Sequence, residues 1–402
     1  LYQNVPNPRG KNKDVFHVDP LIGWNTYPLS YTPIFISRTE ENPLNKENKY
    51  SMLVNVTEDI ANNPEAMILN RGYYGMNLRK EVSYHLSMYI KSKNYTALLQ
   101  VMLVDEQGKP VSTQLVLDVK GKEWTKLTGT LKPDKDVKRG MLAIQPLGKG
   151  QFQLDVVSLF PSDTWDNGKS VFRADIMQNL KEYAPDFIRF PGGCIVEGTD
   201  IASRYDWKKS VGMVENRPLN ENRWQYTFPH RFFPDYYQSY GLGFYEFFQL
   251  SEEIGAEPLP VLSCGLACQF QNPNMDAHVP LCDLESYIQD ALDLIEFANG
   301  AVDTPWGKIR ADMGHPAPFN LKLIGIGNEQ WGKEYPEHLV PFVKAIRKKY
   351  PDIKIVGSSG PDSEGEQFDY LWPEMKSLKA DLVDEHFYRP EAWFLSQGAR
   401  YD

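Results

Sequence analysis

Polar and apolar residues alternate along the chain between about residues 50 and 160. Residues 81–91 read EVSYHLSMYIK, where small or apolar side chains alternate with polar ones, as in a strand with one buried face. Turn residues such as Gln107-Gly108 and Gly148 to Gly150 separate further segments of this kind. Short strands joined by tight turns predict an antiparallel, jelly-roll-like β-sandwich. The other predicted strands cover residues 97–104, 111–118, 124–131, 141–145 and 151–157.

Beyond about residue 160, segments with a helical period alternate with short apolar segments. Phe244, Phe247, Phe248 and Ile254 form one apolar stripe that stops at Gly255. This alternation predicts parallel strands joined by crossover helices. A doubly wound sheet and a (β/α)₈ (TIM) barrel both fit, but the lack of a glycine-rich phosphate loop after the first strand favours the barrel. Helices are predicted at 173–183, 244–254, 284–298 and 337–349, and strands at 186–190, 258–262, 321–327, 353–357 and 382–387.

The 402-residue length exceeds that of one ordinary compact domain. We expect a linker or remnant of an upstream barrel segment over 1–25, the sandwich over 26–160, and a partial barrel over 161–402. Hydrophobic residues make up 42% and charged residues 24%, a profile typical of folded globular chains. No stretch approaches the roughly 20 apolar residues of a membrane helix.

Charge and cysteine content exclude several kinds of partner. The formal net charge of −10 argues against nucleic acid or an anionic membrane surface as the main partner. Cys264 and Cys268 have the spacing of a metal pair, but no second pair or histidine cluster accompanies them. We therefore expect ordinary thiols, no metal and no cofactor.

In a barrel, catalytic groups gather where the strands end. Three such ends carry polar groups: Arg189 to Cys194, Asn328 to Trp331, and Asp384 to Tyr388. Glu329 is the main candidate, either as a general acid beside a sugar-binding Asn328 or as a helix cap or ion-pair partner. Trp331 could offer a stacking face to a sugar.

The other candidates also have two interpretations each. Arg189 could clamp a substrate or form a buried ion pair, with Asp384 or Glu385 as its partner. His386 and Tyr388 share one face of their strand, where they could orient a catalytic carboxylate or only fill the barrel. The aromatic-rich stretch 224–240 could be a sugar platform or a packed loop.

Several segments resemble the α-L-arabinofuranosidases of glycoside hydrolase family 51. They are RFPGGCIVEG (189–198), GLGFYEFFQLSEEIGAEPL (241–259), GHPAPFNLKLIGIGNEQWG (314–332) and DEHFY (384–388). The resemblance runs from about residue 157 to the end. The preceding sandwich is similar to a carbohydrate-binding-type module of some bacterial members, with GYYGM (72–76) and Trp124 at comparable positions.

The resemblance implies a retaining glycosidase that releases terminal non-reducing α-L-arabinofuranosyl residues from arabinoxylan- or arabinan-type glycans. Glu329 is then the general acid/base at the end of barrel strand four, beside the sugar-binding amide of Asn328. Arg189 and the loop through Cys194 would line the arabinose subsite. His386 and Tyr388 would flank the nucleophile, about 5–5.5 Å from the acid/base.

The resemblance also implies barrel strands and a nucleophile that residues 1–402 do not contain. The visible strands correspond to barrel strands two to six, so the first is expected before Leu1 and the nucleophilic glutamate beyond Asp402. Glu385 should point away from the barrel mouth, because its neighbour His386 points into it. A non-catalytic carbohydrate-binding fragment, or a related barrel glycosidase such as a xylosidase or endoglucanase, is the alternative. We expect arabinose-containing plant polysaccharides and oligosaccharides as partners and a secreted or periplasmic location over a cytoplasmic one; the sequence leaves a homo-oligomer open.

Overall fold

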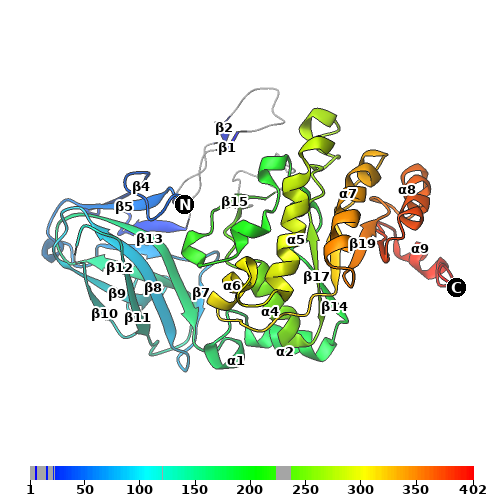
Figure 1. The fold of residues 1–402 in the computed structure, drawn as a ribbon. Coiled ribbons are helices and arrows are strands. Elements are labelled where there is room, and N and C mark those ends of the chain that lie inside the picture. The colour runs from blue at the N-terminus through cyan, green and yellow to red at the C-terminus, as the bar shows by residue number, and fades with distance from the viewer. Residues whose placement is uncertain (1–4, 7–14, 17–20, 22, 120, 223–236) are drawn as a thin grey trace. The chain divides into compact units, whose positions relative to one another are not determined.

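The computed structural model describes residues 5–6, 15–16, 21, 23–119, 121–222 and 237–402 (Figure 1). Packing divides the chain into two units, Leu1–Glu182 and Tyr183–Asp402. The expected linker over 1–25 lies mostly outside the described residues. The elements described within it are β1 (Val5–Pro6), which pairs with β2 (Val15–Phe16), and the start of β3. The limits predicted for the domains stay a prediction.

Two antiparallel sheets build the first unit, as the alternating pattern predicts. One has the order β10-β9-β12-β6-β3, with β7 also on β12, and the other β11-β8-β13-β5-β4. The strands are β3 (Trp24–Tyr27), β4 (Ile34–Thr39), β5 (Ser51–Val56), β6 (Met67–Asn70), β7 (Met76–Leu78), β8 (Tyr84–Ser92), β9 (Leu98–Val104), β10 (Leu115–Asp118), β11 (Thr125–Leu131), β12 (Val137–Pro146) and β13 (Gly150–Pro161). The unit also contains η1 (Ile60–Asn62), α1 (Trp165–Gly168) and most of α2 (Ala174–Tyr183).

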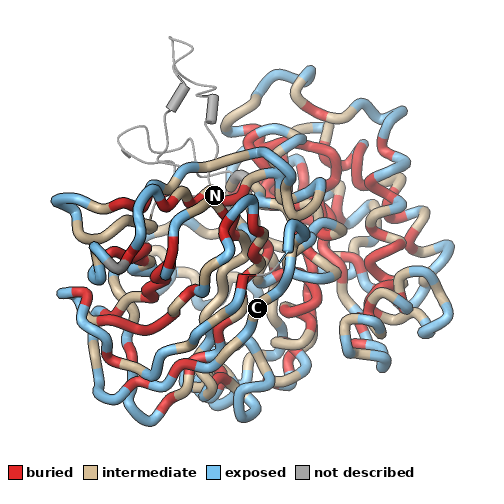
Figure 2. The backbone as a smooth tube through the Cα atoms, turned by 90° about the vertical axis from the view of Figure 1, so that its left-hand side faces the viewer, coloured by how far each residue is buried: buried red, intermediate tan, exposed pale blue. Residues whose placement is uncertain are grey.

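Alternation along β8 shows why this segment forms a strand. Tyr84, Leu86, Met88 and Ile90 are buried in the core between the sheets, and the residues between them are exposed or half-buried. Figure 2 shows the backbone coloured by burial, with buried and more exposed segments alternating along the chain. The strands β6, β9 and β12 depart from this predicted alternation, because they are buried on both faces over part of their length. Their outward-facing residues form a second, smaller apolar cluster.

The second unit contains a parallel sheet in the order β14-β17-β18-β19-β20. The predicted strands and helices of this unit are all present, with ends shifted by a few residues. The strands are β14 (Phe187–Phe190), β17 (Glu257–Leu262), β18 (Leu323–Ile326), β19 (Lys354–Ser358) and β20 (Leu382–Asp384). The helices are α3 (Cys194–Glu197), α4 (Phe244–Ile254), α5 (Glu285–Asn299), α6 (Pro305–Asp312), α7 (Glu334–Lys349), α8 (Glu366–Ser377) and α9 (Glu391–Ser396).

Shorter elements of this unit are η2 (Ile201–Ser203), η3 (Trp207–Ser210), η4 (Val214–Asn216), η6 (Met275–Ala277) and η7 (Leu281–Asp283), with the pair β15 (Asn220–Glu221) and β16 (Tyr237–Gln238). The apolar stripe of α4 packs into the main core, and the helix ends at Gly255, whose φ of +79° is left-handed as expected for a glycine stop. Within the described residues no helix is long and apolar enough to cross a membrane.

The parallel sheet curls strongly. Its strands follow one another in sequence order, without the reversal that marks a doubly wound sheet. The first and last strands of a flat sheet of five would lie about 19 Å apart, four spacings of about 4.8 Å. Arg189 on β14 nevertheless lies 2.9 Å from Asp384 at the end of β20. The curl brings the carboxyl ends of β14, β18 and β20 together at one site.

Candidate active site

Glu329 stands at the carboxyl end of β18 in an unusual backbone conformation. The buried strand ends at Ile326, and Gly327 and Asn328 lead to Glu329, which has a φ of +50°. Residues with a side chain rarely adopt this left-handed conformation, and it persists where the surroundings hold it. The residue is only 5% exposed. The turn therefore fixes one carboxylate at the end of the strand.

Three side chains contact the Glu329 carboxylate. His386 Nδ1 lies 2.7 Å from Oε1, and the Tyr388 hydroxyl donates to the same oxygen at 2.6 Å. Cys194 Sγ lies 3.6 Å from Oε2. Burial acts to raise the pKa of Glu329, but the contacts with His386 and Tyr388 outweigh burial and hold it below its usual value. Glu329 is thus held as a carboxylate in the isolated site.

His386 bridges two carboxylates. Its Nε2 lies 3.2 Å from Asp384 Oδ2, opposite the contact with Glu329. Only the doubly protonated ring can donate to both acceptors. Burial acts to lower the pKa of His386, but the two carboxylates raise it to about 9. The imidazolium therefore supplies a positive charge between them.

Arg189 and Asn328 form the other side of the site. Arg189 Nη2 donates to Asn328 Oδ1 at 2.8 Å and to Asp384 Oδ2 at 2.9 Å. Asn328 Nδ2 donates to Glu197 Oε1 at 2.9 Å. The amide oxygen of Asn328 accepts from the Arg189 cation and its nitrogen donates to the Glu197 carboxylate, so the orientation of the amide is fixed.

The sequence did not lead us to expect Glu197 as a site residue. It is 3% exposed and lies on α3, three residues after Cys194. The available signal was a single carboxylate within the small and apolar run that follows Arg189. Gly193 opens this helix, and a Cβ added there would lie 2.5 Å from Asn328 Oδ1. The glycine is therefore required for the close approach of α3 to the amide.

The structure brings Arg189, Cys194, Asn328, Glu329, His386 and Tyr388 into one network. Trp331 lies apart from it: its ring packs edge-on against Phe270, with centroids 4.7 Å apart. Asp384 is the partner of Arg189, whereas Glu385 points elsewhere, to Arg400 and Tyr401.

Most of the aromatic stretch 224–240 lies outside the described residues. Tyr240, at its end, is buried and packs edge-on against Tyr205, with ring centroids 4.8 Å apart. No group of three or more histidine, cysteine or acidic side chains in the described ranges could hold a metal ion. The groups available for chemistry are the buried Glu329 carboxylate, the three side chains that contact it, and the Asn328 amide oriented by Arg189 and Glu197.

Several known proteins similar to this chain are named α-L-arabinofuranosidases. The Alpha-L-arabinofuranosidase 1 domain matches residues 179–402. The extracellular exo-α-L-arabinofuranosidase of Streptomyces chartreusis is 38% identical over 348 residues, covering 83% of this chain and 40% of that enzyme. Alpha-L-arabinofuranosidase 1 of Arabidopsis thaliana is 32% identical over 363 residues, covering 86% of this chain and 50% of that enzyme. The chain thus spans at most half the length of these two relatives.

A solved structure agrees with the fold. An arabinose-bound α-L-arabinofuranosidase of family GH51 matches with a TM-score of 0.79 at 23% identity, over 95% of this chain and 58% of that chain. This similarity extends over both units.

Proposed function

Since the chain belongs to the α-L-arabinofuranosidases of glycoside hydrolase family 51, we propose that it hydrolyses terminal non-reducing α-L-arabinofuranosyl groups, with Glu329 as the general acid/base. The observation that carries the assignment is the position of Glu329. It is a buried carboxylate in a left-handed turn at a strand end, hydrogen-bonded by two side chains of the strand-end segment after β20. A helix cap or a surface ion pair requires neither the burial nor this convergence.

The five parallel strands form part of a (β/α)₈ barrel in this proposal. Sequential strand order and the contact between Arg189 and Asp384 across the first and last strands support it. In such barrels the active site lies at the carboxyl ends of the strands, where Glu329, Asn328 and His386 stand. The remaining strands are expected outside residues 1–402.

Each side chain has a role in the proposed reaction. Glu329 gives its proton to the glycosidic oxygen as the bond to the sugar breaks, and then takes a proton from water in the second step. Asn328, held by Arg189 and Glu197, presents its amide to a sugar hydroxyl. The nucleophile is the glutamate expected beyond Asp402, which would form a glycosyl-enzyme intermediate with retention of configuration.

Glu329 must be protonated to act as the acid. His386 and Tyr388 lower its pKa in the isolated site. A second carboxylate about 5.5 Å away would repel the Glu329 charge by about 3 kcal/mol at an effective dielectric constant of about 20. This repulsion raises the pKa of Glu329 and supports protonation. Charging the nucleophile and protonating Glu329 are therefore linked.

The substrate and location follow from the relatives. We propose arabinose-containing plant polysaccharides and their oligosaccharides as substrates. The Streptomyces enzyme is named as extracellular and exo-acting. An extracellular location and removal of terminal residues are accordingly proposed for this protein.

Replacement of Glu329 by glutamine tests the function. With the longest form of the protein that contains residues 1–402, Glu329→Gln should lower turnover of arabinofuranosyl oligosaccharides at least about 100-fold. Aryl α-L-arabinofuranosides with good leaving groups should lose less, since they need little protonation. Glu337→Gln, an exposed glutamate on α7, is the matched control and should retain full activity.

Three results would contradict the proposal. Equal oligosaccharide turnover by Glu329→Gln and the parent would remove Glu329 from the reaction. Retention on arabinoxylan without any product release would favour the non-catalytic binding protein. Faster hydrolysis of aryl β-xylosides than of aryl arabinofuranosides would favour the related xylosidase.

A further inference from the structure

The outer face of the sheet β10-β9-β12-β6-β3 carries an apolar layer of its own. In a β-sandwich, the residues that face away from the core are ordinarily polar and alternate along each strand with the buried ones. On this face, five apolar side chains are instead buried, while their neighbours along each strand enter the core between the sheets. The five are Met67, Leu69, Met102, Val104 and Ala143. The loops at the strand ends supply the walls that cover this layer.

Two adjoining cavities lie over this apolar floor. The first has a volume of about 470 Å³ and is lined by Tyr27, Arg71, Tyr73, Tyr74 and Met141, among others. The second has a volume of about 380 Å³ and is lined by Tyr27, Met67, Met102, Gln100, Gln114 and Gln145, among others. Because Tyr27 lines both, the two cavities are neighbours, and together they are termed here the Tyr27 groove. Each part falls in the roughly 300–1,000 Å³ range of small-molecule sites.

Aromatic rings are presented at one end of the groove. Tyr73 and Tyr74 are 75% and 83% exposed, and their rings lie 5.3 Å apart at 73°. Both belong to the loop between β6 and β7, within the GYYGM segment, whereas Trp124 does not line either cavity. Exposed tyrosines of this kind offer an apolar face with a polar tip. A sugar ring, with C–H groups on its faces and hydroxyls at its rim, is the matching shape.

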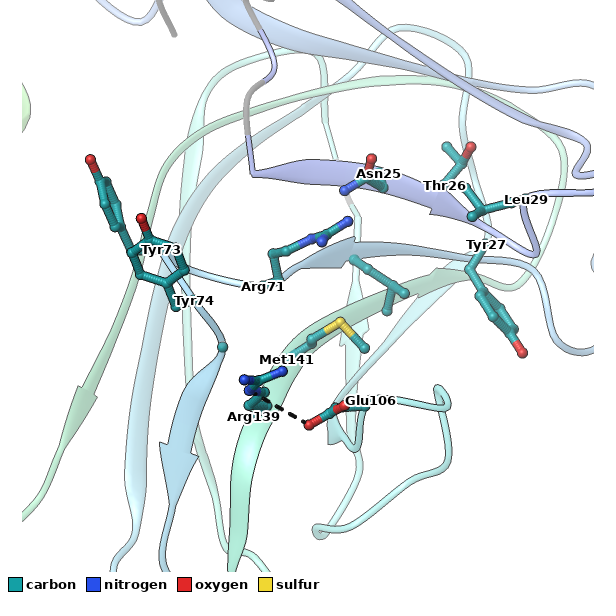
Figure 3. Close-up of a pocket in the computed structure, with 12 residues that line it drawn as sticks. Asn25, Thr26, Tyr27, Leu29, Arg71, Tyr73, Tyr74, Glu106, Arg139 and Met141 are labelled. Carbon is teal, nitrogen blue, oxygen red and sulfur yellow. Dashed lines mark ion pairs between the residues drawn. The ribbon is translucent and has the colours of Figure 1, made fainter. Parts of the chain in front are cut away.

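Polar groups line the rest of the groove. Arg71 projects toward the cavity in Figure 3, and its guanidinium has no hydrogen-bond or ion-pair partner among the described residues. The carboxamides of Gln100 and Gln114 bond to each other, and Gln145 Nε2 donates to the backbone oxygen of Pro64 at 2.7 Å. These fixed amides and the guanidinium can exchange hydrogen bonds with hydroxyl groups.

The charge of the groove is nearly balanced. Arg139 and Glu106 face each other at 4.0 Å in the first cavity, and Glu65 and Lys109 line the second. One unpaired guanidinium amid such pairs does not make a strong anion site. The balance favours a neutral ligand with many hydroxyls.

From the apolar floor, the exposed tyrosines, the amides and the balanced charge together, we propose that the Tyr27 groove binds a stretch of a neutral glycan chain, separately from the active site. The identification of this glycan as the arabinofuranosyl-bearing polymer rests on the proposed function. Two neighbouring cavities, each in the size range of a small-molecule site, offer room for more than one sugar unit.

The test is affinity electrophoresis of the longest form of the protein that contains residues 1–402, in gels containing soluble arabinoxylan, with polygalacturonate as an anionic comparison. A Glu329→Gln background keeps the polymer intact. The parent should be retarded by arabinoxylan, and Tyr73→Ala/Tyr74→Ala should weaken its association at least about tenfold. Phe35→Ala, an aromatic residue 58% exposed on β4 of the other sheet, is the matched control and should change nothing. Arg71→Ala provides a second, independent groove variant and should also weaken binding.

Three outcomes would overturn the proposal. They are no retardation of the parent, equal retardation of the parent and both groove variants, or stronger retardation by polygalacturonate than by arabinoxylan. The groove variants in the Glu329 parent should hydrolyse a small aryl α-L-arabinofuranoside at the unchanged rate, and a lower rate would also contradict a separate site. Failure of all arabinofuranoside hydrolysis with arabinoxylan binding intact would instead overturn the proposed function and leave the groove standing.

Discussion

The protonation of His386 is a direct consequence of the two carboxylates beside it. We predict that its imidazole titrates at a pKa of about 9, in place of the ordinary 6.5. The difference corresponds to about 3 kcal/mol of preferential interaction with the protonated ring, at about 1.4 kcal/mol for a tenfold change. Its side chain is 17% exposed, so solvent screens the contacts only partly. Glu329 at 2.7 Å and Asp384 at 3.2 Å provide the attraction.

The sign of the effect on stability follows from linkage. The folded state binds the proton of His386 more tightly than the unfolded state. Its contribution is therefore full below pH 6.5, falls as pH rises, and is lost above about pH 9. At the acid end the contribution declines once Glu329 and Asp384 become protonated, because the pKa of each is lowered by these contacts.

Proton NMR of the imidazole rings measures this pKa. The chain has seven histidines, and the resonance missing from His386→Gln identifies the relevant one. Glu329→Gln should lower the His386 pKa while leaving it above 6.5, because Asp384 remains. Urea unfolding should show a larger loss of stability for His386→Gln at pH 6 than at pH 9.5. A midpoint near 6.5 in the parent, or a stability loss independent of pH, would refute the reasoning.

Three further substitutions test the support of the site. Gly193→Ala should displace the Asn328 amide and lower turnover about 100-fold. Gly398→Ala is the control and should have no effect, because no atom lies within 4 Å of the added Cβ. Equal activities of the two variants would contradict the close approach of Gly193 to Asn328. Glu197→Gln should lower kcat about tenfold or more, because the Asn328 amide loses its anionic acceptor, while the thermal unfolding midpoint stays unchanged. An unchanged kcat would show that Glu197 does not position the amide. Tyr335→Phe should lower the free energy of unfolding by about 1–3 kcal/mol in urea titrations, because the buried hydroxyl bridges the backbones of β18 and β19; a loss below about 0.5 kcal/mol would contradict it.

Periodicity was enough to predict most elements of the second unit. The stripe of α4 and the apolar strand before Gly327 are local signals, because each is encoded within a dozen residues. The strands of the first unit before residue 80 were not predicted individually. They are two to six residues long, and β6 reads Met-Ile-Leu-Asn, which is buried on both faces and does not alternate. The second face is buried by loops distant in sequence, so its pattern is set by tertiary packing.

The candidate site was partly predictable for a related reason. Residues at the ends of parallel strands converge, so Arg189, Asn328, Glu329 and His386 could be named from their positions. The pairing of Arg189 with Asp384 could be named only as one of several alternatives, because the two residues are 195 positions apart and meet only through the curl of the sheet. Prediction of Trp331 as a sugar-stacking face stays untested, and its ring packs on Phe270.

The charges of the site explain why the second carboxylate of the proposed mechanism would change the pKa of Glu329 strongly. Around the contacts from Arg189 to Glu329, positive and negative groups alternate: Arg189, Asp384, His386 and Glu329. Along this path two cations balance two anions, and Glu197 joins it only through the neutral amide of Asn328, so the path itself has no excess charge to drive proton uptake by Glu329. A further carboxylate at the distance of a retaining pair makes the network negative, and protonation of Glu329 is the change that restores the balance. In the proposed retaining mechanism, formation of the glycosyl-enzyme consumes the nucleophile, and that charge disappears. The pKa of Glu329 then falls back toward the lowered value of the isolated site, as a base for the second step requires.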